Sequence, residues 1–276
     1  MNGTQLRHAL HSGKRVYGTL IVSESPRWVQ DALPALGLDF VFIDTEHIAL
    51  SRTPLSWMCQ ACSALGIAPI VRIPSPDPFQ ATMAIDGGAQ GVIAPYLETP
   101  EQVRLVAGAL RLRPLRGIRM QNAVSGKEQL EPELAAYVAE RREKIVFIAN
   151  IESVPAMQNL DEILKIEGLD GVLIGPHDLS CSLGIPEQYT HPRYIAAVDE
   201  IIAKARAAGK GAGIHLAYPN GLEQEMRWVK DGANLIVHSA DILVFRQAMR
   251  RELDAIRRAA GDLPGSAADQ SQHPAI

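Results

Sequence analysis

Short apolar runs rich in β-branched residues alternate with longer amphipathic stretches along most of the 276-residue chain. This alternation is typical of repeated strand-helix units and a parallel sheet. The pattern predicts eight strands, over Arg15–Val22, Phe40–Asp44, Pro69–Ile73, Gly91–Pro95, Ile145–Ile151, Gly171–Ile174, Gly213–Leu216 and Asn234–Val237. It predicts helices between and after them, over residues 27–37, 52–65, 78–87, 100–111, 154–165, 192–208, 220–231 and 241–259.

The number of units and the breaks between them favour a closed barrel. Most predicted helices are followed by a glycine before the next strand, for example Gly37, Gly66 and Gly209. The first strand is not followed by GxGxxG, the motif of a dinucleotide-binding open sheet. Barrels of eight such units commonly run to about 250 residues as one domain. We therefore predict a single α/β domain, a (β/α)8 TIM barrel, over residues 1–260.

Two segments depart from the regular spacing. Residues 113–142 are too long for a plain turn between a helix and a strand, and a partly helical excursion near one rim is predicted there. Residues 261–276 are polar and rich in small side chains, so a disordered tail is predicted.

Composition and charge narrow the class of protein. The chain is 47% hydrophobic and 21% charged, and a core of its size needs no disulfide to stay folded. Its net charge is −4 with lysines and arginines scattered, so no nucleic acid partner is expected. No apolar run approaches the roughly 18 residues of a membrane span, and the first residues lack the apolar core of a signal peptide. A cytoplasmic protein with small-molecule partners and no membrane partner is expected.

Cys59 and Cys62 form a CxxC motif within a predicted helix. A redox pair or half of a zinc site is one interpretation, and two small core residues one helical turn apart is the favoured one, because no second CxxC or His pair accompanies them. Cys181 stands alone and is expected to serve packing.

Charged side chains gather where predicted strands end. In an α/β barrel the carboxyl ends of the strands surround the mouth, where catalytic groups sit. The strand ends carry Asp44, Glu46, His47, Arg72, Glu152, His177 and Asp178. One arginine facing several carboxylates is costly to desolvate unless a cation offsets the negative charge.

Glu152 and Asp178, from neighbouring strand ends, are the predicted ligands of that cation. Two carboxylates with room for water or substrate oxygens suit Mg²⁺ or Mn²⁺, and Co²⁺ is a further candidate. The alternative is that both carboxylates only cap the helices that follow them.

The segment Gly175-Pro176-His177-Asp178 joins the sixth strand to a following helix. Glycine lets a ligand approach the backbone, and the amides of a helix N-terminus attract anions, so a substrate carboxylate is one predicted occupant. An ordinary turn with proline at the first helical position explains the same residues equally well.

Five motifs fall in order along the chain: IDTEH, VRIP, DGGAQGVIAPYLETPEQ, NIES and GLDGVLIGPHDLS. Together they resemble the HpcH/HpaI family of metal-dependent 2-oxo acid aldolases, over roughly Val16 to Ile256. The resemblance implies that Glu152 and Asp178 hold the metal and that Arg72 contacts the oxo acid and stabilises the enolate charge. We therefore expect substrate contacts from Arg72, Gly175, Pro176, His177 and Leu216.

The resemblance also implies roles that spacing alone does not give. His47 would be the acid/base group, Asp44 would support it, and Asp86 would reach across a subunit interface to a neighbour's His47. The implied assembly is a homohexamer built as a trimer of dimers. The implied reaction joins the enolate of pyruvate, or a related 2-oxo acid, to an aldehyde, or cleaves the 4-hydroxy-2-oxo acid product.

The chain departs from the family pattern at two positions that would border the substrate. Leu20 stands where many members carry an aromatic residue, and His177 stands where many carry alanine. The segment from Met120 to Leu130 also looks shorter and less basic than its family counterpart. The aldehyde, its stereochemistry and the direction of reaction are therefore left open.

Rival interpretations concern both the metal site and the reaction. His177, His215 and His238 end three successive predicted strands and could form a zinc or iron site, although they more simply shape the acceptor side of the pocket. No lysine ends a predicted strand, which argues against a Schiff-base aldolase, and no glycine-rich phosphate loop follows the last two strands. An acyl-CoA lyase of the related citrate-lyase type, and a non-catalytic barrel that binds 2-oxo acids, remain the alternatives.

Overall fold

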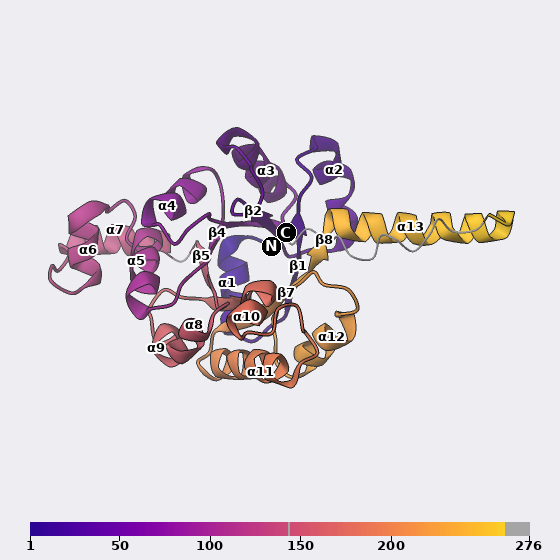
Figure 1. Ribbon diagram of the computed structural model, residues 1–276. Helices are drawn as coiled ribbons and strands as arrows, with labels where there is room; N and C mark the ends of the chain where they lie inside the picture. The colour runs from indigo at the N-terminus through magenta and orange to yellow at the C-terminus, as the bar shows by residue number, and fades with distance from the viewer. Residues whose placement is uncertain (143, 263–276) are drawn as a thin grey trace.

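The computed structural model describes residues 1–142 and 144–262, and its eight parallel strands close into a barrel in sequence order (Figure 1). The last strand pairs with the first in parallel, with Val16 beside Leu235. The strands are β1 Val16–Ile21, β2 Phe40–Asp44, β3 Ala68–Arg72, β4 Gly91–Ala94, β5 Val146–Asn150, β6 Gly171–Ile174, β7 Gly211–Leu216 and β8 Leu235–Ala240. The predicted (β/α)8 fold is confirmed, and every predicted strand is present within a few residues of its expected bounds.

Helices surround the barrel and connect its strands. They are α1 Gly3–His11, α2 Pro26–Asp31, the 3-10 helix η1 Leu33–Leu36, α3 Arg52–Ala64, α4 Pro78–Asp86, α5 Pro100–Arg111, α6 Gly117–Val124, α7 Pro132–Arg142, α8 Val154–Gln158, α9 Leu160–Leu164, α10 Pro176–Ser182, α11 Pro192–Ala207, α12 Leu222–Lys230 and α13 Asp241–Ala260. Residues 27–37 and 154–165, each predicted as one helix, are each divided into two shorter ones. The predicted excursion over 113–142 contains α6 and α7, so its partly helical character is confirmed.

Helix α1 was not predicted, and it closes the amino-terminal end of the barrel. Asn2 caps it through a capping box with Gln5, an arrangement that satisfies two free N–H groups at once. Leu6 and Leu10 of α1 are fully buried and belong to the same cluster as Phe40 of β2 and Leu235 of β8. The inside of the barrel is therefore filled by strand side chains and plugged by this helix.

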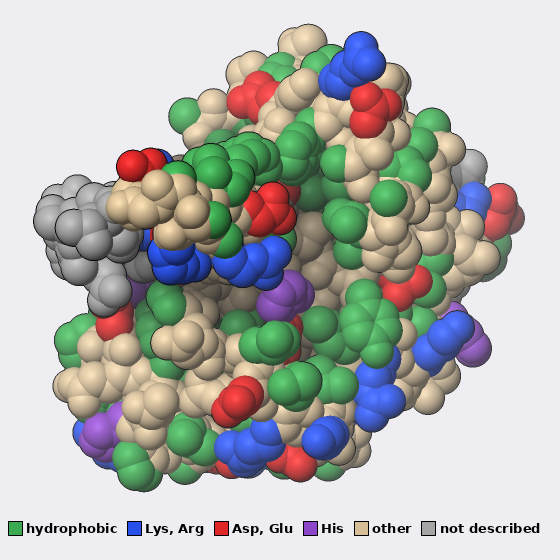
Figure 2. Space-filling model, turned by 90° about the vertical axis from the view of Figure 1, so that its right-hand side faces the viewer, with side chains coloured by type: hydrophobic (Ala, Val, Ile, Leu, Met, Phe, Trp, Pro, Cys, Tyr) green, Lys and Arg blue, Asp and Glu red, His purple; other side chains and the backbone are tan. Residues whose placement is uncertain are grey.

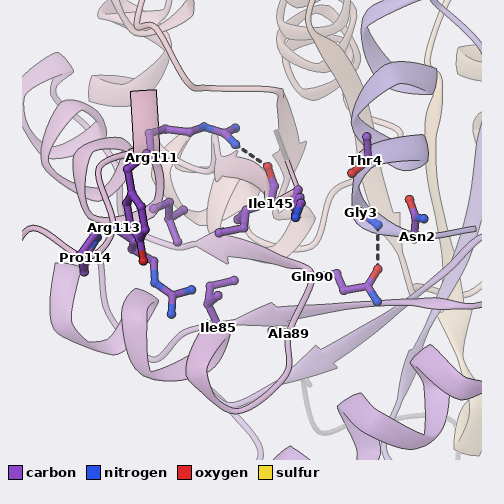
Figure 3. A pocket seen from close by; sticks show the side chains of 13 residues that line it. Asn2, Gly3, Thr4, Ile85, Ala89, Gln90, Arg111, Arg113, Pro114 and Ile145 are labelled. Atoms are coloured by element: carbon purple, nitrogen blue, oxygen red, sulfur yellow. Dashed lines mark hydrogen bonds between the residues drawn. The ribbon is translucent and has the colours of Figure 1, made fainter. Parts of the chain in front are cut away.

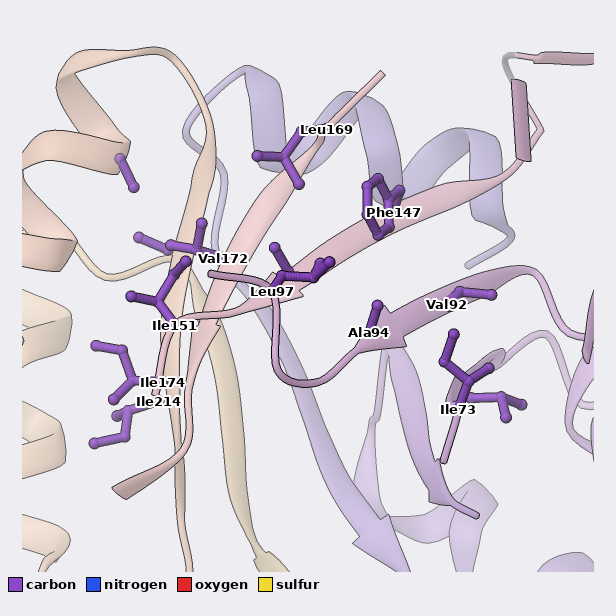
Figure 4. Close-up of a cluster of buried hydrophobic side chains, with 14 of the residues drawn as sticks. Ile73, Val92, Ala94, Leu97, Phe147, Ile151, Leu169, Val172, Ile174 and Ile214 are labelled. Atoms are coloured by element: carbon purple, nitrogen blue, oxygen red, sulfur yellow. The ribbon is translucent and has the colours of Figure 1, made fainter. Parts of the chain in front are cut away.

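A second and larger apolar cluster lies between the strands and the surrounding helices (Figure 4). It takes the alternate strand residues, such as Val92 of β4, Phe147 of β5 and Val172 of β6, because successive side chains of a strand point to opposite faces. The two clusters account for strands that are apolar on both faces. They hold the strand ends, and with them the mouth, in fixed positions.

The amino-terminal end of the barrel, here called the base, is tied by one buried aspartate. Asp170, just before β6, is completely buried and accepts hydrogen bonds from Arg7 Nε at 2.8 Å and Phe147 N at 2.9 Å. Arg111 also donates to it, and His11 Nε2 lies 2.9 Å from Oδ1. The base therefore links α1, α5, β5 and β6 through a single carboxylate.

A cavity of about 630 Å³ also opens at the base, beside the start of α1 (Figure 3). Gly3 N donates to Gln90 Oε1 at 2.7 Å, and Arg111 donates to the carbonyl of Ile145. Its lining includes the start of α1, the ends of α4 and α5, and the residues just before β4 and β5, so this cavity lies at the end of the barrel opposite the mouth. It is distinct from the predicted site.

Helix α13 leaves the barrel and projects from one side of the molecule (Figure 1). None of its residues 241–260, all of which are described, is buried. Large apolar side chains are exposed along it: Ile242, Val244, Phe245, Met249, Leu253 and Ile256. Hydrophobic side chains are gathered on this projecting helix in the view from that side (Figure 2).

Across residues 1–142 and 144–262, no helix combines the length and apolar character needed to cross a membrane. The tail predicted to be disordered, 261–276, falls outside the described residues from 263 onward.

Candidate active site at the mouth of the barrel

The predicted charged residues come together at the carboxyl ends of the strands. Two cavities open there, of about 150 and 170 Å³, and both are lined by Asn150 and Asp178. The first is also lined by His47 and Arg72, and the second by Glu152. The mouth therefore has two compartments that meet at Asn150 and Asp178.

Arg72, the last residue of β3, is held by a two-pronged ion pair. Its Nε donates to Asp44 Oδ1 at 2.8 Å and one terminal nitrogen donates to Oδ2 at 2.6 Å. Burial lowers the pKa of Arg72, but the hydrogen bonds and charge of Asp44 outweigh it and leave the pKa above its usual value. The guanidinium also lies over the ring of Phe42, 5.2 Å from its centre. A planar cation is thus fixed in one orientation at the edge of the cavity.

Asp44, the last residue of β2, organises the loop that follows it. It accepts a hydrogen bond from Glu46 N at 3.0 Å and a longer one from His47 N at 3.4 Å. Burial raises the pKa of Asp44, but the hydrogen bonds and charge of Arg72 outweigh burial. The pKa of Asp44 is therefore below its usual value. Asp44 therefore contacts His47 through the backbone N–H of His47.

Glu46 and His47 stand next to each other beside Arg72. Glu46 Oε2 lies 3.0 Å from Arg72 Nε and 3.8 Å from His47 Nε2. Oε2 is nevertheless a buried oxygen with no hydrogen bond, because the Nε hydrogen of Arg72 is directed at Asp44. The His47 side chain is 39% exposed, so it can be reached from the cavity.

Glu152 lies two residues past the end of β5 and is 5% exposed. Its Oε1 accepts from Tyr96 N at 2.9 Å, and its Oε2 accepts from Asn150 Nδ2 at 3.0 Å. Burial raises the pKa of Glu152 to about 7, and the negative charges of Asp178 and Glu46 add to the effect. The charge of Arg72 offsets this rise only in part, and no salt bridge to Glu152 is present among the described residues.

Asp178 lies in the first turn of α10, the short helix that follows β6. The turn brings Gly175 against Glu152: a Cβ added to Gly175 would lie 2.5 Å from Glu152 Oε2. Only glycine leaves that space to the carboxylate. Gly175, Pro176 and His177 line the 150 Å³ cavity, so the segment predicted to contact substrate does face it.

The donor set at the mouth fits a hard divalent cation. Four carboxylates, Asp44, Glu46, Glu152 and Asp178, face one arginine, and Asn150 Oδ1 is a further buried oxygen without a hydrogen-bond partner. No group of three or more His, Cys, Asp or Glu side chains within the described residues is arranged to hold a metal. Mg²⁺ and Mn²⁺ do not require one, because they are often held by two carboxylates together with water and substrate oxygens.

Two predicted site residues lie away from the mouth cavities. Leu216 packs in the outer apolar cluster, so the wall at the end of β7 comes from Ala217 and Tyr218 instead. Asp86 ends α4 at the base, where it is half exposed and pairs with Arg113 and Arg116. Within one chain, Asp86 and His47 lie at opposite ends of the barrel.

His177, His215 and His238, the alternative zinc or iron ligands, have three different surroundings. His215 is buried inside the barrel with Nε2 3.1 Å from the carbonyl of Ser239, and burial lowers its pKa to about 4, so it is neutral. His177 lines the cavity, whereas His238 pairs with Glu225 of α12 at 2.6 Å. His177 and His215 therefore line the same cavity, and His238 is not among its described lining residues.

Two of the three cysteines are buried and one is exposed. Cys59 and Cys62 are buried in α3, where burial raises the pKa of Cys59 to about 12 and that of Cys62 to about 11. These values are typical of unreactive core thiols, and both are free. The prediction that Cys181 serves packing is wrong, because this residue is exposed. Its Sγ lies 3.8 Å from His177 Nε2.

Sequence reasoning missed several residues of the site. Asn150 is two residues before Glu152, and period-two alternation along a strand could have placed both on one face. Tyr96 follows β4 with a φ of 53°, and a hydrogen bond between its hydroxyl and Glu46 raises its pKa. Glu187, Tyr189 and Tyr218 also line the cavity, from loops that carry no periodic signal.

Comparison with known proteins gives the same assignment as the motifs. The family model described as HpcH/HpaI aldolase/citrate lyase matches residues 18–248. A 2-keto-3-deoxy-L-rhamnonate aldolase of Salmonella gallinarum is 31% identical over 247 residues, 90% of this chain and 91% of that protein. The protein of the same name from Klebsiella pneumoniae is 32% identical over 234 residues, 85% of this chain and 86% of its own length.

Solved structures agree with the fold. An HpcH/HpaI aldolase from Desulfitobacterium hafniense superposes with a TM-score of 0.78 at 27% identity, covering 94% of this chain and 98% of that one. Citrate synthase SbnG superposes with a TM-score of 0.78 at 30% identity, covering 93% and 99%. The predicted resemblance is confirmed, and the relatives support an enzyme of the class II aldolase type. The chain belongs to the HpcH/HpaI aldolase/citrate lyase family.

Proposed function

We propose that the chain is a metal-dependent aldolase that joins the enolate of pyruvate, or a related 2-oxo acid, to an aldehyde, or cleaves the resulting 4-hydroxy-2-oxo acid. The observation that carries this proposal is the placement of two neighbouring carboxylates, the buried Glu152 and Asp178, beside a fixed guanidinium. The relatives named 2-keto-3-deoxy-L-rhamnonate aldolase support the same class of reaction.

Glu152 and Asp178 are the proposed metal ligands. A bound Mg²⁺ or Mn²⁺, with Co²⁺ a further candidate, would supply the Lewis-acid stabilisation that makes a proton beside the carbonyl removable. Tyr96 N and Asn150 Nδ2 hold the two oxygens of Glu152 in place for this task. Gly175 leaves the room in which that carboxylate lies.

Arg72 is proposed to bind the oxo acid and to stabilise negative charge as the enolate forms. Its two bonds to Asp44 fix the plane of the guanidinium before substrate arrives, so little reorganisation is needed during the reaction. Gly175, Pro176 and His177 form the adjoining wall of the cavity.

His47 is the proposed acid/base group. It borders the cavity, and an imidazole has an ordinary pKa close to neutral pH, which suits proton transfer to and from an aldehyde oxygen. Asp44 positions it through the backbone. We propose that Asp86 acts on the His47 of another subunit, since the two residues lie at opposite ends of the same barrel.

A homo-oligomer, with the hexamer implied by the family resemblance, is part of the proposal. Helix α13 supports it, because twenty residues with no buried side chain and exposed Phe245, Met249 and Ile256 make an unusually large apolar surface for a monomer. Light scattering on the purified protein is expected to give six times the chain mass. A monomer at micromolar concentration would overturn the assembly and with it the role of Asp86.

The aldolase is tested by incubating the protein with pyruvate in D₂O. Loss of the methyl proton signal by NMR is expected with Mg²⁺ and not with chelator, and mass spectrometry gives the same readout with Mn²⁺. Binding of pyruvate without exchange would favour a passive binding barrel instead. An acyl-CoA lyase is less well supported, since Arg72 is the only lysine or arginine lining the 150 Å³ cavity in the described part of the chain. A cytoplasmic location stays a prediction from the sequence.

A further inference from the structure

One wall of the 150 Å³ cavity is built by two loops that lie outside the proposed catalytic groups. The segment after α10 supplies Glu187 and Tyr189, and the segment after β7 supplies Tyr218. With His177 they form a continuous surface, here called the acceptor wall. The oxo acid is assigned to Arg72 and the metal ligands, so this wall faces the second substrate.

Buried hydrogen bonds fix Glu187 at the rim. The hydroxyl of Ser180, itself completely buried, donates to the carbonyl of His177 at 2.7 Å and accepts from Glu187 N at 3.0 Å. Glu187 has a φ of 58°, in the left-handed region that residues other than glycine seldom adopt. Its Oε1 lies 3.7 Å from His177 Nδ1. The backbone thus holds a carboxylate beside the cavity although the side chain is exposed.

The two tyrosines form a flat and rigid part of the same wall. Their rings stack with centres 4.0 Å apart and planes 13° apart. Gln224 joins the two loops, because its Oε1 accepts from the Tyr218 hydroxyl at 3.0 Å and its Nε2 donates to the carbonyl of Tyr189 at 2.9 Å. Aromatic faces of this kind pack well against the C–H groups of a small carbon chain.

The charge of the wall is unsuited to an anion. Arg72 is the only lysine or arginine among the described lining residues, and its charge is opposed by Asp44 and Glu46. His215, on the same cavity, is neutral at physiological pH. Within one chain, an aldehyde that carried a carboxylate or phosphate would meet Glu187 with no lysine or arginine other than Arg72 among the described lining residues to offset the repulsion.

We propose, on the basis of the aldolase function, that the acceptor wall selects an uncharged hydroxylated aldehyde and rejects anionic ones. Glu187 accepts a hydrogen bond from a substrate hydroxyl, His177 lies beside that group, and the stacked tyrosines cover the carbon chain. The Glu187 carboxylate then contributes to specificity in two ways: it attracts a substrate hydroxyl and repels a substrate anion.

The test compares glyceraldehyde with 4-oxobutanoate as acceptors for pyruvate in the Mn²⁺-loaded protein. The wild-type protein is expected to give the higher kcat/KM with glyceraldehyde. Glu187→Lys is expected to shift the ratio of the two kcat/KM values toward 4-oxobutanoate by roughly tenfold or more, the size of a charge reversal near the substrate, and Glu187→Gln by less. The matched control is Glu133→Lys on α7, an exposed residue outside the site, which should leave the ratio unchanged.

Deuterium exchange into pyruvate tests the aldolase function separately from the acceptor wall. If both Glu187 variants still exchange pyruvate but keep the wild-type acceptor ratio, or if the wild-type protein prefers 4-oxobutanoate, the acceptor wall is overturned and the aldolase stands. If the wild-type protein itself exchanges no pyruvate with metal, both fail.

Discussion

The base and the mouth of the barrel each bury a carboxylate, and the pKa values of the two are shifted in opposite directions. At the base, Asp170 meets Arg7, Arg111, His11 and a backbone N–H. Burial raises its pKa, but these partners outweigh burial and hold the pKa below its usual value. At the mouth, burial raises the pKa of Glu152 to about 7, and neighbouring carboxylates reinforce the shift.

The difference separates a group that stabilises the fold from one kept ready for a ligand. Every oxygen of Asp170 is satisfied within the chain, so the base gains stability without any outside partner. The mouth concentrates negative charge and unpaired oxygens, an arrangement that costs stability until a cation binds. Variants at the two ends should therefore affect different properties.

The largest expected effect is at Glu152. Glu152→Gln removes a proposed metal ligand while keeping the shape of the side chain, so metal-dependent pyruvate exchange should fall by roughly a thousandfold or more. The thermal midpoint of the metal-free protein should not fall, because the variant removes a buried charge that burial and the neighbouring carboxylates disfavour. Exchange rates and calorimetry measure both.

The matched control is Glu162→Gln, at an exposed glutamate of α9 that pairs with Lys165. It should change neither property. Full exchange activity in Glu152→Gln would remove Glu152 from the metal site.

Asp170 is expected to show the reverse behaviour. Asp170→Asn leaves Arg111 and Arg7 without their buried counter-charge, which should lower the free energy of unfolding by about 3 kcal/mol. Exchange activity of the folded fraction should stay close to wild type, because the base is remote from the mouth. Urea unfolding at constant protein concentration measures the loss, and a loss of activity at unchanged stability would contradict the comparison.

Acid unfolding sharpens this prediction. Because the pKa of Asp170 is lowered in the folded state, its contribution to stability is fully present above the ordinary value of 3.8 and is lost as pH falls through the folded pKa. Wild-type stability should therefore fall more steeply below about pH 4 than that of Asp170→Asn. Parallel pH profiles would assign the acid sensitivity to other carboxylates.

A smaller effect is expected at Arg72. Arg72→Lys keeps the positive charge but cannot reproduce the two parallel bonds to Asp44, so the cation should lose its fixed orientation. We expect kcat for aldol cleavage to fall by about a hundredfold, with metal affinity little changed. Steady-state kinetics with pyruvate-derived substrates measure it, and wild-type kinetics would exclude Arg72 from the reaction.

The smallest expected effect is at Gly175. In Gly175→Ala the new Cβ would lie 2.5 Å from Glu152 Oε2, so the carboxylate must move. Affinity for Mn²⁺ should weaken by about tenfold, with little change in unfolding free energy. Gly184→Ala is not a matched control because Gly184 has a φ of 72°, whereas Gly87→Ala, at a φ of −73°, is suitable.

Much of the fold could be predicted because the barrel repeats one local pattern. Each β-branched run, such as Phe40–Asp44, is buried on both sides and reads as a strand without any knowledge of its neighbours. Helix α1 escaped prediction because Leu6 and Leu10 are explained only by the interior that they plug. The exposure of α13 could not be predicted either, because the apolar residues of this segment indicate a buried helix face.

The candidate site likewise contains residues that the sequence predicts and residues that it does not. Arg72, Glu152 and Asp178 could be found because strand ends of a barrel converge on one mouth whatever the loops do. Leu216 was expected at the mouth because it ends a strand, but strand alternation directs it to the outer cluster. Glu187 depends on a left-handed turn and on the hydroxyl of Ser180, a tertiary arrangement with no local signature.

The most direct test of the account is a crystal structure of the protein grown with Mn²⁺ and oxalate, a mimic of the pyruvate enolate. We expect an anomalous scattering peak between the carboxylates of Glu152 and Asp178, with oxalate completing the coordination and one of its oxygens within hydrogen-bond distance of Arg72. A manganese ion bound elsewhere, or those two carboxylates turned away from the ion, would contradict the proposed function.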